Sequence, residues 1–403
     1  MLQFINRNLL ILFTCQLIFV TGTVLLVTVG GLVGYELAAT PGLATLPVAL
    51  MVVGTAAAAI PAAMIMAKMG RRWGFLLATG MAAGGAGIAV VAMQAQSFWL
   101  FCLATGLMGA SLGFSQHFRY AAAESVAPAG VSYAVSFILL GSIAGALLPP
   151  ELIALSSAAD QDRPYRLAFL LVIGLYALAA LAVSGFKPRA PMAEETSSAS
   201  DSAPRSLWAV AAQPLFFTAV LAGVVGQGVM TYIMTATPIS MNVNDGFSIL
   251  ETSEVIRAHV IAMYLPSLVT PWLISRWGLK PVMLAGLAAF AVTLMIGMAG
   301  QHMLHYWFAL VLLGIGWNFL FVAGTTMLVT AYRDSERFKC QAFNDFSIFA
   351  GSALASLLAG SVLHSFSWTI LLLSSVPLLL VMGLALLYLW RWQTRQAVAG
   401  SSL

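Results

Sequence analysis

Long apolar stretches alternate with short polar connections along almost the whole chain of 403 residues. Each stretch is about 20 residues long, which is what an α-helix needs to cross the hydrocarbon core of a bilayer. Membrane β-strands would instead give short segments of alternating polarity. We therefore expect an all-α membrane protein with twelve transmembrane helices. The predicted spans cover residues 8–34, 43–67, 73–95, 97–117, 131–156, 166–186, 213–238, 255–275, 279–300, 303–330, 340–364 and 367–390.

The composition supports the same fold class. Hydrophobic residues make up 61% of the chain and charged residues only 8%, whereas soluble proteins carry about 25% charged residues. The first apolar stretch predicts a retained helix, with a cleaved signal peptide as the alternative. Cys15, Cys102 and Cys340 are far apart in the sequence, so we expect small packing residues rather than a disulfide framework.

One long polar insert, from Lys187 to Arg205, interrupts the pattern. Its middle, residues 196–202, is mostly serine, which is typical of a flexible linker. The insert separates six predicted spans from six. We therefore predict an N-terminal six-helix bundle over 1–186, a linker over 187–207 and a C-terminal six-helix bundle over 208–403.

The positive charges predict the orientation of the chain. All but three of the 18 lysines and arginines fall in loops on the side of the N-terminus, the exceptions being Arg163, Arg166 and Arg257. Basic residues concentrate on the cytoplasmic side of membrane proteins. The pattern predicts a multi-pass membrane protein with both termini and the linker in the cytoplasm. It also explains the net charge of +4 without a nucleic-acid partner.

The two predicted halves resemble each other. Lys68-Met-Gly-Arg-Arg72 follows span two, and Arg276-Trp-Gly-Leu-Lys280 follows span eight. Repeated halves are typical of secondary transporters that rock about a central site. The layout resembles the major facilitator superfamily. The end of that family's loop signature is present as Gly70, Arg71 and Arg72, but Ala67 stands where an aspartate is expected. A latching role for the two arginines therefore competes with simple anchoring at the membrane surface.

Two pairs of soft donors stand out in spans seven and eight. Met230 and Met234 are one helical turn apart, and so are His259 and Met263. From the predicted span ends, Met234 should face His259 and Met230 should face Met263 across a helical hairpin. Thioethers and imidazole together suit a soft metal ion, above all Cu(I). The alternatives are core packing for the methionines and a solvated helix end for the histidine.

At these residues the sequence resembles the CcoA-type copper importers, bacterial members of the major facilitator superfamily that supply copper for cbb3-type cytochrome oxidase assembly. The segments His117–Glu124 and Gln341–Asp345 are also typical of that branch. The resemblance implies that Met230, Met234, His259 and Met263 bind copper as the transported ligand. A close branch imports riboflavin, so a flavin is the alternative cargo.

Further polar residues are candidates for coupling or gating. Asp345 lies inside span eleven near the cytoplasmic side, where it could carry a coupling proton or be a helix-terminal charge. Arg119 and Glu124 could latch the cytoplasmic side by pairing with each other, or be solvated. With Arg71 and Arg72 they complete the predicted gating set.

The predicted mechanism is alternating access by two rocking halves. No Walker motif is present in the sequence, so ATP is not the direct energy source. We expect no prosthetic group, no enzymatic activity and a monomer in the lipid bilayer. A flavin importer would need aromatic stacking surfaces and would tolerate loss of the sulfurs. A drug or small-molecule efflux permease would have a broad apolar cavity that does not depend on His259.

Overall fold

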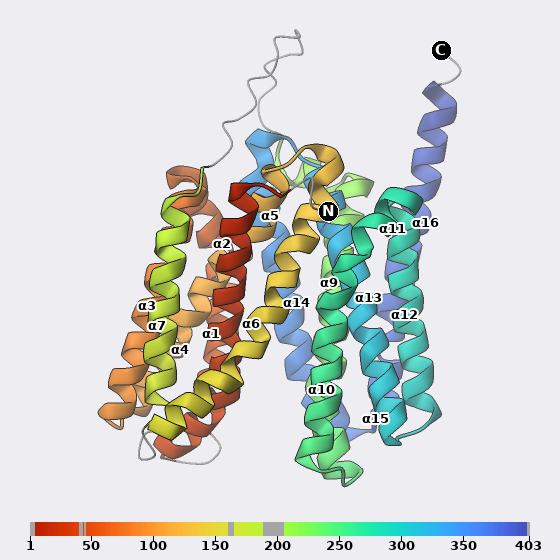
Figure 1. The fold of residues 1–403 in the computed structure, drawn as a ribbon. Coiled ribbons are helices and arrows are strands. Elements are labelled where there is room, and N and C mark those ends of the chain that lie inside the picture. The colour runs from red at the N-terminus through yellow and green to blue at the C-terminus, as the bar shows by residue number, and fades with distance from the viewer. Residues whose placement is uncertain (1–4, 40–42, 44–45, 160–164, 188–204, 401–403) are drawn as a thin grey trace. The chain divides into compact units, whose positions relative to one another are not determined.

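The computed structural model describes residues 5–39, 43, 46–159, 165–187 and 205–400. Within these residues the secondary structure is entirely helical. The chain divides into two compact units (Figure 1). Unit 1 comprises residues 1–200 together with the short segment Gln341–Phe346, and unit 2 comprises 201–340 and 347–403. The predicted linker falls almost wholly on 188–204, outside the described residues.

The described part of unit 1 contains six long helices, three of which (α2, α3 and α4) are joined in sequence by short turns. The α2 and α3 helices both pack against α4, and α1 packs against α6, while α7 lies on α3. The short α5 helix follows α4. The bounds are α1 (Arg7–Leu37), α2 (Leu46–Met69), α3 (Arg71–Gln94), α4 (Phe98–Ser115), α5 (Phe118–Glu124), α6 (Val131–Ala159) and α7 (Arg166–Ser184).

Unit 2 is arranged around α13, against which α9, α10 and α12 pack. The α16 helix packs on α9 and α12. A π-helical turn, Ser240–Asn244, extends the C-terminal end of α9. The bounds are α8 (Leu207–Ala211), α9 (Pro214–Ile239), α10 (Ile249–Tyr264), α11 (Thr270–Trp277), α12 (Leu279–Ala299), α13 (Met303–Val329), α14 (Arg337–Ser365), α15 (Trp368–Leu373) and α16 (Val376–Gly400).

The helices confirm a multi-pass membrane fold. Among the described residues, eleven helical segments are long and apolar enough to span a bilayer, and a bent pair brings the number to twelve. The bent pair is the predicted eighth span. It bends by 48° between Leu268 and Thr270, so it is not the single straight helix that its apolar pattern indicates. Pro266 and Pro271 lie on either side of the bend, and proline cannot supply the N–H that a continuous helix requires.

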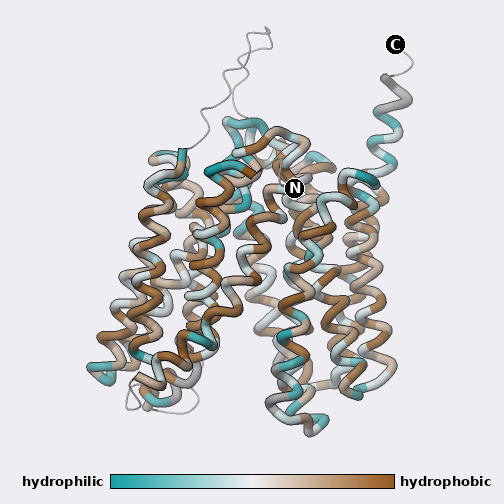
Figure 2. The backbone as a smooth tube through the Cα atoms, in the orientation of Figure 1, coloured by the Kyte–Doolittle hydropathy of each residue, from teal (hydrophilic) through white to brown (hydrophobic). Residues whose placement is uncertain are grey.

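Close contacts between small residues hold the helices of each unit together. In unit 1, a β-carbon on Gly109 of α4 would lie 2.1 Å from the Met51 carbonyl oxygen of α2, so only glycine fits there. The Thr55 hydroxyl of α2 donates to the Gly109 carbonyl at 3.0 Å. Such small contacts and interhelical hydrogen bonds are the usual basis of helix packing where water is absent. Figure 2 shows apolar residues along most of the helix lengths and polar residues gathered toward helix ends.

Candidate functional site

The two predicted donor pairs lie on helices that share one neighbour, α13. A β-carbon on Gly314 of α13 would lie 2.8 Å from the His259 carbonyl oxygen and 2.9 Å from the Met263 nitrogen, so α10 sits directly on this glycine. On the α9 side, Gly226 lies against Leu320, within 3.3 Å by the same measure. Positions along α13 can therefore be used to compare the depths of the donors on α9 and α10.

The contacts with α13 give the relative depths of the four donors along the helix axis. The α9 helix runs antiparallel to α13, so Met230, one turn beyond Gly226, lies level with residues of α13 near 316. Met263 lies at the level of Gly314, about 3 Å away along the axis at 1.5 Å per residue. The depths of Met234 and His259 along the axis also differ by about 3 Å. The register is consistent with the predicted pairing by depth, and convergence of all four donors on one ion stays a prediction.

His259 is the most constrained of the four donors. Its side chain is fully buried, and Nδ1 lies 2.7 Å from the backbone carbonyl oxygen of Leu310 on α13. Its Nε2 is buried and has no hydrogen-bond partner among the described residues. The alternative of a solvated helix end does not hold. A histidine that donates one ring N–H to a carbonyl while keeping the other nitrogen available has the arrangement of a metal ligand.

The methionines are largely enclosed. Met230 and Met263 are 6% and 7% exposed, and Met234 is half-buried. Among the described residues, no group of three His, Cys, Asp or Glu side chains is arranged to hold a metal ion. A metal site in this part of the chain would therefore depend on methionine sulfur.

Asn318 of α13 supports the break that follows Met263. Its amide nitrogen donates to the Met263 carbonyl and to the Ser267 hydroxyl, each at 2.7 Å. Its amide oxygen accepts from the Thr270 hydroxyl at 2.7 Å. Because the helix is interrupted here, a buried backbone carbonyl would otherwise lack a donor. Asn318 was not among the residues predicted from the sequence, although an amide in the middle of an apolar span is a signal in its own right.

An aromatic and amide cluster lies next to the donor pairs on the same helices. The Trp317 ring stacks on Phe321 with centroids 4.7 Å apart and meets Tyr264 edge-on at 5.7 Å. The indole N–H donates to the Gln227 side-chain oxygen of α9 at 2.8 Å. Trp317 is buried, whereas Gln227 and Tyr264 are half-buried and keep part of their surface accessible. None of these residues stands out in the sequence, because aromatic residues are common in apolar spans.

A polar strip continues from this cluster along α9. The Gln227 amide nitrogen lies 3.3 Å from the Thr231 hydroxyl, and Thr231 is hydrogen-bonded to Ser352 of α14 at 2.9 Å. Gln227 and Thr231 are one turn apart and therefore occupy one face of the helix. Together with Tyr264, they offer amide, hydroxyl and aromatic surface to a ligand.

In unit 1, Arg71 lies at the centre of a buried polar network. Its guanidinium forms an ion pair with Glu124, with Nε 2.9 Å from Oε2. It also donates to Gln341 at 2.8 Å and to the Nδ1 of His117 at 3.2 Å. Arg72, the next residue, is exposed and takes no part in these contacts.

Arg119 and Asp345 form a second buried ion pair in unit 1. The Tyr120 hydroxyl donates to the same carboxylate oxygen at 2.6 Å, and the Asn344 amide donates to that hydroxyl at 2.8 Å. The predicted pairing of Arg119 with Glu124 is therefore wrong. The two residues are five apart on α5, and only residues three or four apart share a helix face. Arg119 pairs with Asp345 and Glu124 pairs with Arg71. Neither Arg119 nor Glu124 is a solvated loop residue.

Comparison with known proteins gives a consistent result. The sequence model of the major facilitator superfamily matches residues 12–253 and 234–402. The chain is 36% identical over 365 residues to the riboflavin transporter RfnT of Brucella anthropi, covering 90% of each protein. It is also 29% identical to the uncharacterized transporter YddS of Bacillus subtilis, over 98% of this chain and 93% of that protein.

Solved structures share the fold at low sequence identity. The fucose:proton symporter FucP of E. coli superimposes with a TM-score of 0.75 at 17% identity, over 94% of this chain and 98% of that one. A bacterial homologue of the iron transporter ferroportin, in an outward-facing state with soaked iron, gives 0.74 at 12% identity, over 95% and 99%. These likenesses establish the fold and carry no information about the cargo.

Proposed function

Because the chain belongs to the major facilitator superfamily, we propose that it imports a flavin, with riboflavin as the first compound to test, across the bacterial inner membrane. It is a multi-pass secondary transporter and not an enzyme. The similarity to a riboflavin transporter over 90% of the chain supports a flavin as cargo and ranks it ahead of copper, the cargo favoured by the sequence motifs.

The observation that carries this proposal is the aromatic and amide cluster on α9, α10 and α13. A flavin has a flat conjugated ring with hydrogen-bonding groups along one edge. Tyr264 offers an aromatic face and Gln227 an amide, next to a Trp317 ring that is held in place by stacking and a hydrogen bond. Apolar and aromatic walls with a few convergent polar groups are typical of small-molecule sites.

Growth of a riboflavin-auxotrophic bacterium that expresses the chain tests the proposal, together with initial uptake of radiolabelled riboflavin. We expect growth at low external riboflavin, and a loss of roughly tenfold in uptake for Tyr264→Leu and for Gln227→Leu. Tyr388→Leu is the matched control, because Tyr388 is 59% exposed on α16. No growth advantage from the unmodified chain would exclude a flavin as cargo.

Copper is the second candidate, and the position of His259 favours it. The imidazole is buried, oriented by Leu310 and has Nε2 without a partner among the described residues. With Met230, Met234 and Met263 it would give a soft, neutral set of ligands that binds Cu(I) and can still release it. Replacing all three methionines by leucine keeps the packing volume and removes the sulfurs. Cellular copper should then fall to the level of cells without the transporter, whereas riboflavin uptake by the same variant reports separately on the flavin proposal.

We further propose that the buried ion pairs of unit 1 act in gating. Arg71, paired with Glu124, donates to Gln341, and Arg119 pairs with Asp345. Both contacted residues lie in the segment Gln341–Phe346 of α14, a helix whose remainder belongs to unit 2. Asp345 is the proposed coupling site. Arg72 is assigned to membrane-surface anchoring, because it is exposed. Cytoplasmic termini and a monomeric state complete the proposal, and accessibility labelling of a single cysteine at each terminus checks the orientation.

A further inference from the structure

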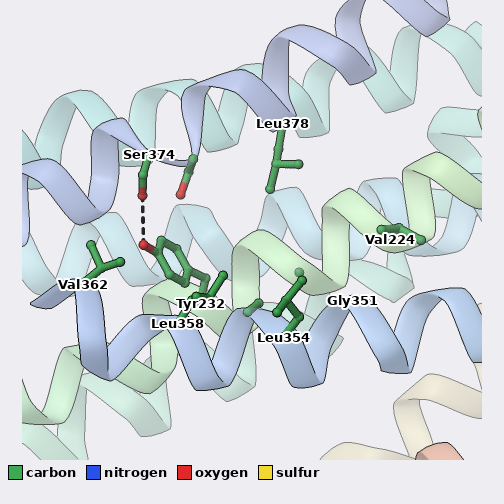
Figure 3. A pocket seen from close by; sticks show the side chains of 11 residues that line it. Val224, Tyr232, Gly351, Leu354, Leu358, Val362, Ser374 and Leu378 are labelled. Carbon is green, nitrogen blue, oxygen red and sulfur yellow. Dashed lines mark hydrogen bonds between the residues drawn. The ribbon is translucent and has the colours of Figure 1, made fainter.

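A cavity of about 470 Å³ lies in unit 2 between α9, α14 and the junction of α15 with α16 (Figure 3). Its wall is almost entirely apolar. The side of α9 that faces it includes Gly228, where a β-carbon would meet no atom within 4 Å. The main apolar lining residues are Val224, Leu354, Leu358, Val362 and Leu378.

The polar groups of the cavity come from one place, the junction of α15 with α16 and the facing tyrosine. Ser374 donates its hydroxyl proton to the Leu371 carbonyl at 2.7 Å, so the Tyr232 hydroxyl is the donor in its 2.9 Å contact with Ser374. This contact is drawn in Figure 3. The neighbouring Ser375 also lines the cavity and is only 1% exposed.

Ser375 gives an independent indication of a ligand. Its side-chain oxygen is buried and has no hydrogen-bond partner among the described residues. Burying an unpaired hydroxyl is unfavourable. A ligand that places an oxygen at this point would satisfy the hydroxyl.

The surroundings indicate that the ligand comes from the bilayer. Leu354 and Leu358 of α14 and Leu378 of α16 line the cavity, yet are 58%, 47% and 44% exposed. Large apolar side chains exposed on membrane-spanning helices are in contact with lipid tails. The cavity also has its hydroxyls toward the C-terminal part of α9 and its glycine and Val224 nearer the middle of that helix, so a bound chain would have its polar group toward the C-terminal end of α9.

We propose that this cavity binds a single-chain amphiphile, a long-chain fatty acid, with its carboxyl group accepting a hydrogen bond from Ser375 and its alkyl chain along Gly228 and Val224. The proposal is independent of the cargo, since it uses none of the residues of the aromatic and amide cluster. The bound chain would fill the space between α9 and α14.

Photolabelling of the full chain in nanodiscs tests the proposal. The probe is palmitic acid with a diazirine on its chain, and the labelled peptides are identified by mass spectrometry. We expect labels on peptides from α9, α14 and the start of α16. Gly228→Leu should place its side chain in the cavity and abolish this labelling. Ser375→Ala should raise the probe concentration that gives half-maximal labelling by about fivefold.

The matched control is Gly174→Leu. Gly174, on α7, likewise has no atom within 4 Å of a β-carbon, but lies outside the cavity. Labelling that persists in Gly228→Leu at the level of this control would overturn the proposal. So would competition by riboflavin, because it would identify the cavity as a cargo site. Monodisperse gel filtration of each variant shows that folding is retained.

Discussion

Nδ1 of His259 lies 2.7 Å from the carbonyl oxygen of Leu310, and this contact determines which ring nitrogen carries the proton. A carbonyl oxygen only accepts hydrogen bonds, so the N–H is at Nδ1 and the lone pair of the neutral ring is at Nε2. The sequence spacing puts Met263 one turn further along the same face. His259 and Met263 therefore lie on the same face of α10.

Replacing His259 by alanine should separate the two candidate cargos. The substitution removes the donor to Leu310 and the proposed copper ligand, and should cost about 1–3 kcal/mol of stability. If copper is carried, its accumulation should fall to background, whereas riboflavin uptake should change by less than about threefold, or 0.65 kcal/mol. Atomic absorption on washed cells and radiolabelled riboflavin uptake measure the two.

The control for this experiment is His302→Ala, at the start of α13, because His302 is exposed. It should leave both uptakes unchanged. Copper accumulation that is equal in the unmodified chain, His259→Ala and cells without the transporter would remove the copper candidate.

Asn318→Leu should destabilise unit 2 strongly. The amide holds Met263, Ser267 and Thr270 together across the break of the eighth span. Leucine has the same number of side-chain heavy atoms and the same branching but leaves three buried polar groups without this partner, at a total cost of roughly 2–4 kcal/mol. The thermal unfolding midpoint in detergent should drop by several degrees.

The control is Thr326→Val, which loses only a hydrogen bond to Val322 within its own helix. It should change stability by about 0.5 kcal/mol or less. Equal midpoints for the two variants would contradict this role of Asn318.

The apolar pattern predicted the spans well because a helix in a bilayer must be apolar along about 20 residues whatever it packs against. The bend in the eighth span was accessible in principle, since Pro266 and Pro271 are visible in the sequence. The apolar residues on both sides of the bend form one continuous apolar stretch, so the hydropathy pattern predicted a single straight helix. What supports the bend could not be predicted, because Asn318 is 51 residues from Ser267 along the chain.

The partners of buried charges were the least predictable part. The sequence places Arg119 and Glu124 close together, yet Arg119 pairs with Asp345, 226 residues away. Hydropathy indicates which residues enter the membrane and says nothing about which polar groups meet there. The depth of the donor pairs, by contrast, was predicted from helix length alone, because the rise per residue is fixed, and it stays a prediction.

The start of α10 should make stability depend on pH at the acidic end. Ser248 and Glu251 form a capping box, in which the Ser248 hydroxyl and backbone N–H both donate to the Glu251 carboxylate. These bonds lower the pKa of Glu251. A lowered pKa in the folded state stabilises the protein above the pKa of the unfolded chain, about 4.3, and the stabilisation is lost as the pH falls through the folded value.

Thermal midpoints of the unmodified chain and of Glu251→Gln, measured from pH 7 to pH 3, test this expectation. The unmodified chain should be the more stable at neutral pH, and the difference should shrink below about pH 4.3. Glu254→Gln is the control, since Glu254 is exposed and its contact with Arg257 is 3.9 Å long. A difference that is constant over the whole range would show that the carboxylate does not stabilise the cap.

The ion pair of Arg119 and Asp345 should behave as a unit. Both side chains are almost fully buried, at 5% and 1% exposure. Removing one partner alone leaves a buried charge uncompensated, so Arg119→Gln and Asp345→Asn should each cost roughly 3–5 kcal/mol. The double substitution leaves no net charge behind and should cost less than the sum of the two by about 0.5–3 kcal/mol.

A double-mutant cycle on the purified protein measures this coupling from thermal midpoints, with Glu254 and Arg257 as a reference pair. Their side chains are 53% and 69% exposed at 3.9 Å, and exposed pairs contribute about 0–1 kcal/mol. Additive costs for Arg119 and Asp345 would mean that the pair is not coupled. If they are coupled and the double variant folds yet fails to take up either cargo, the pair is required for transport as well as for stability, as its proposed gating role demands. Normal uptake by that variant would leave the pair a purely structural part of unit 1.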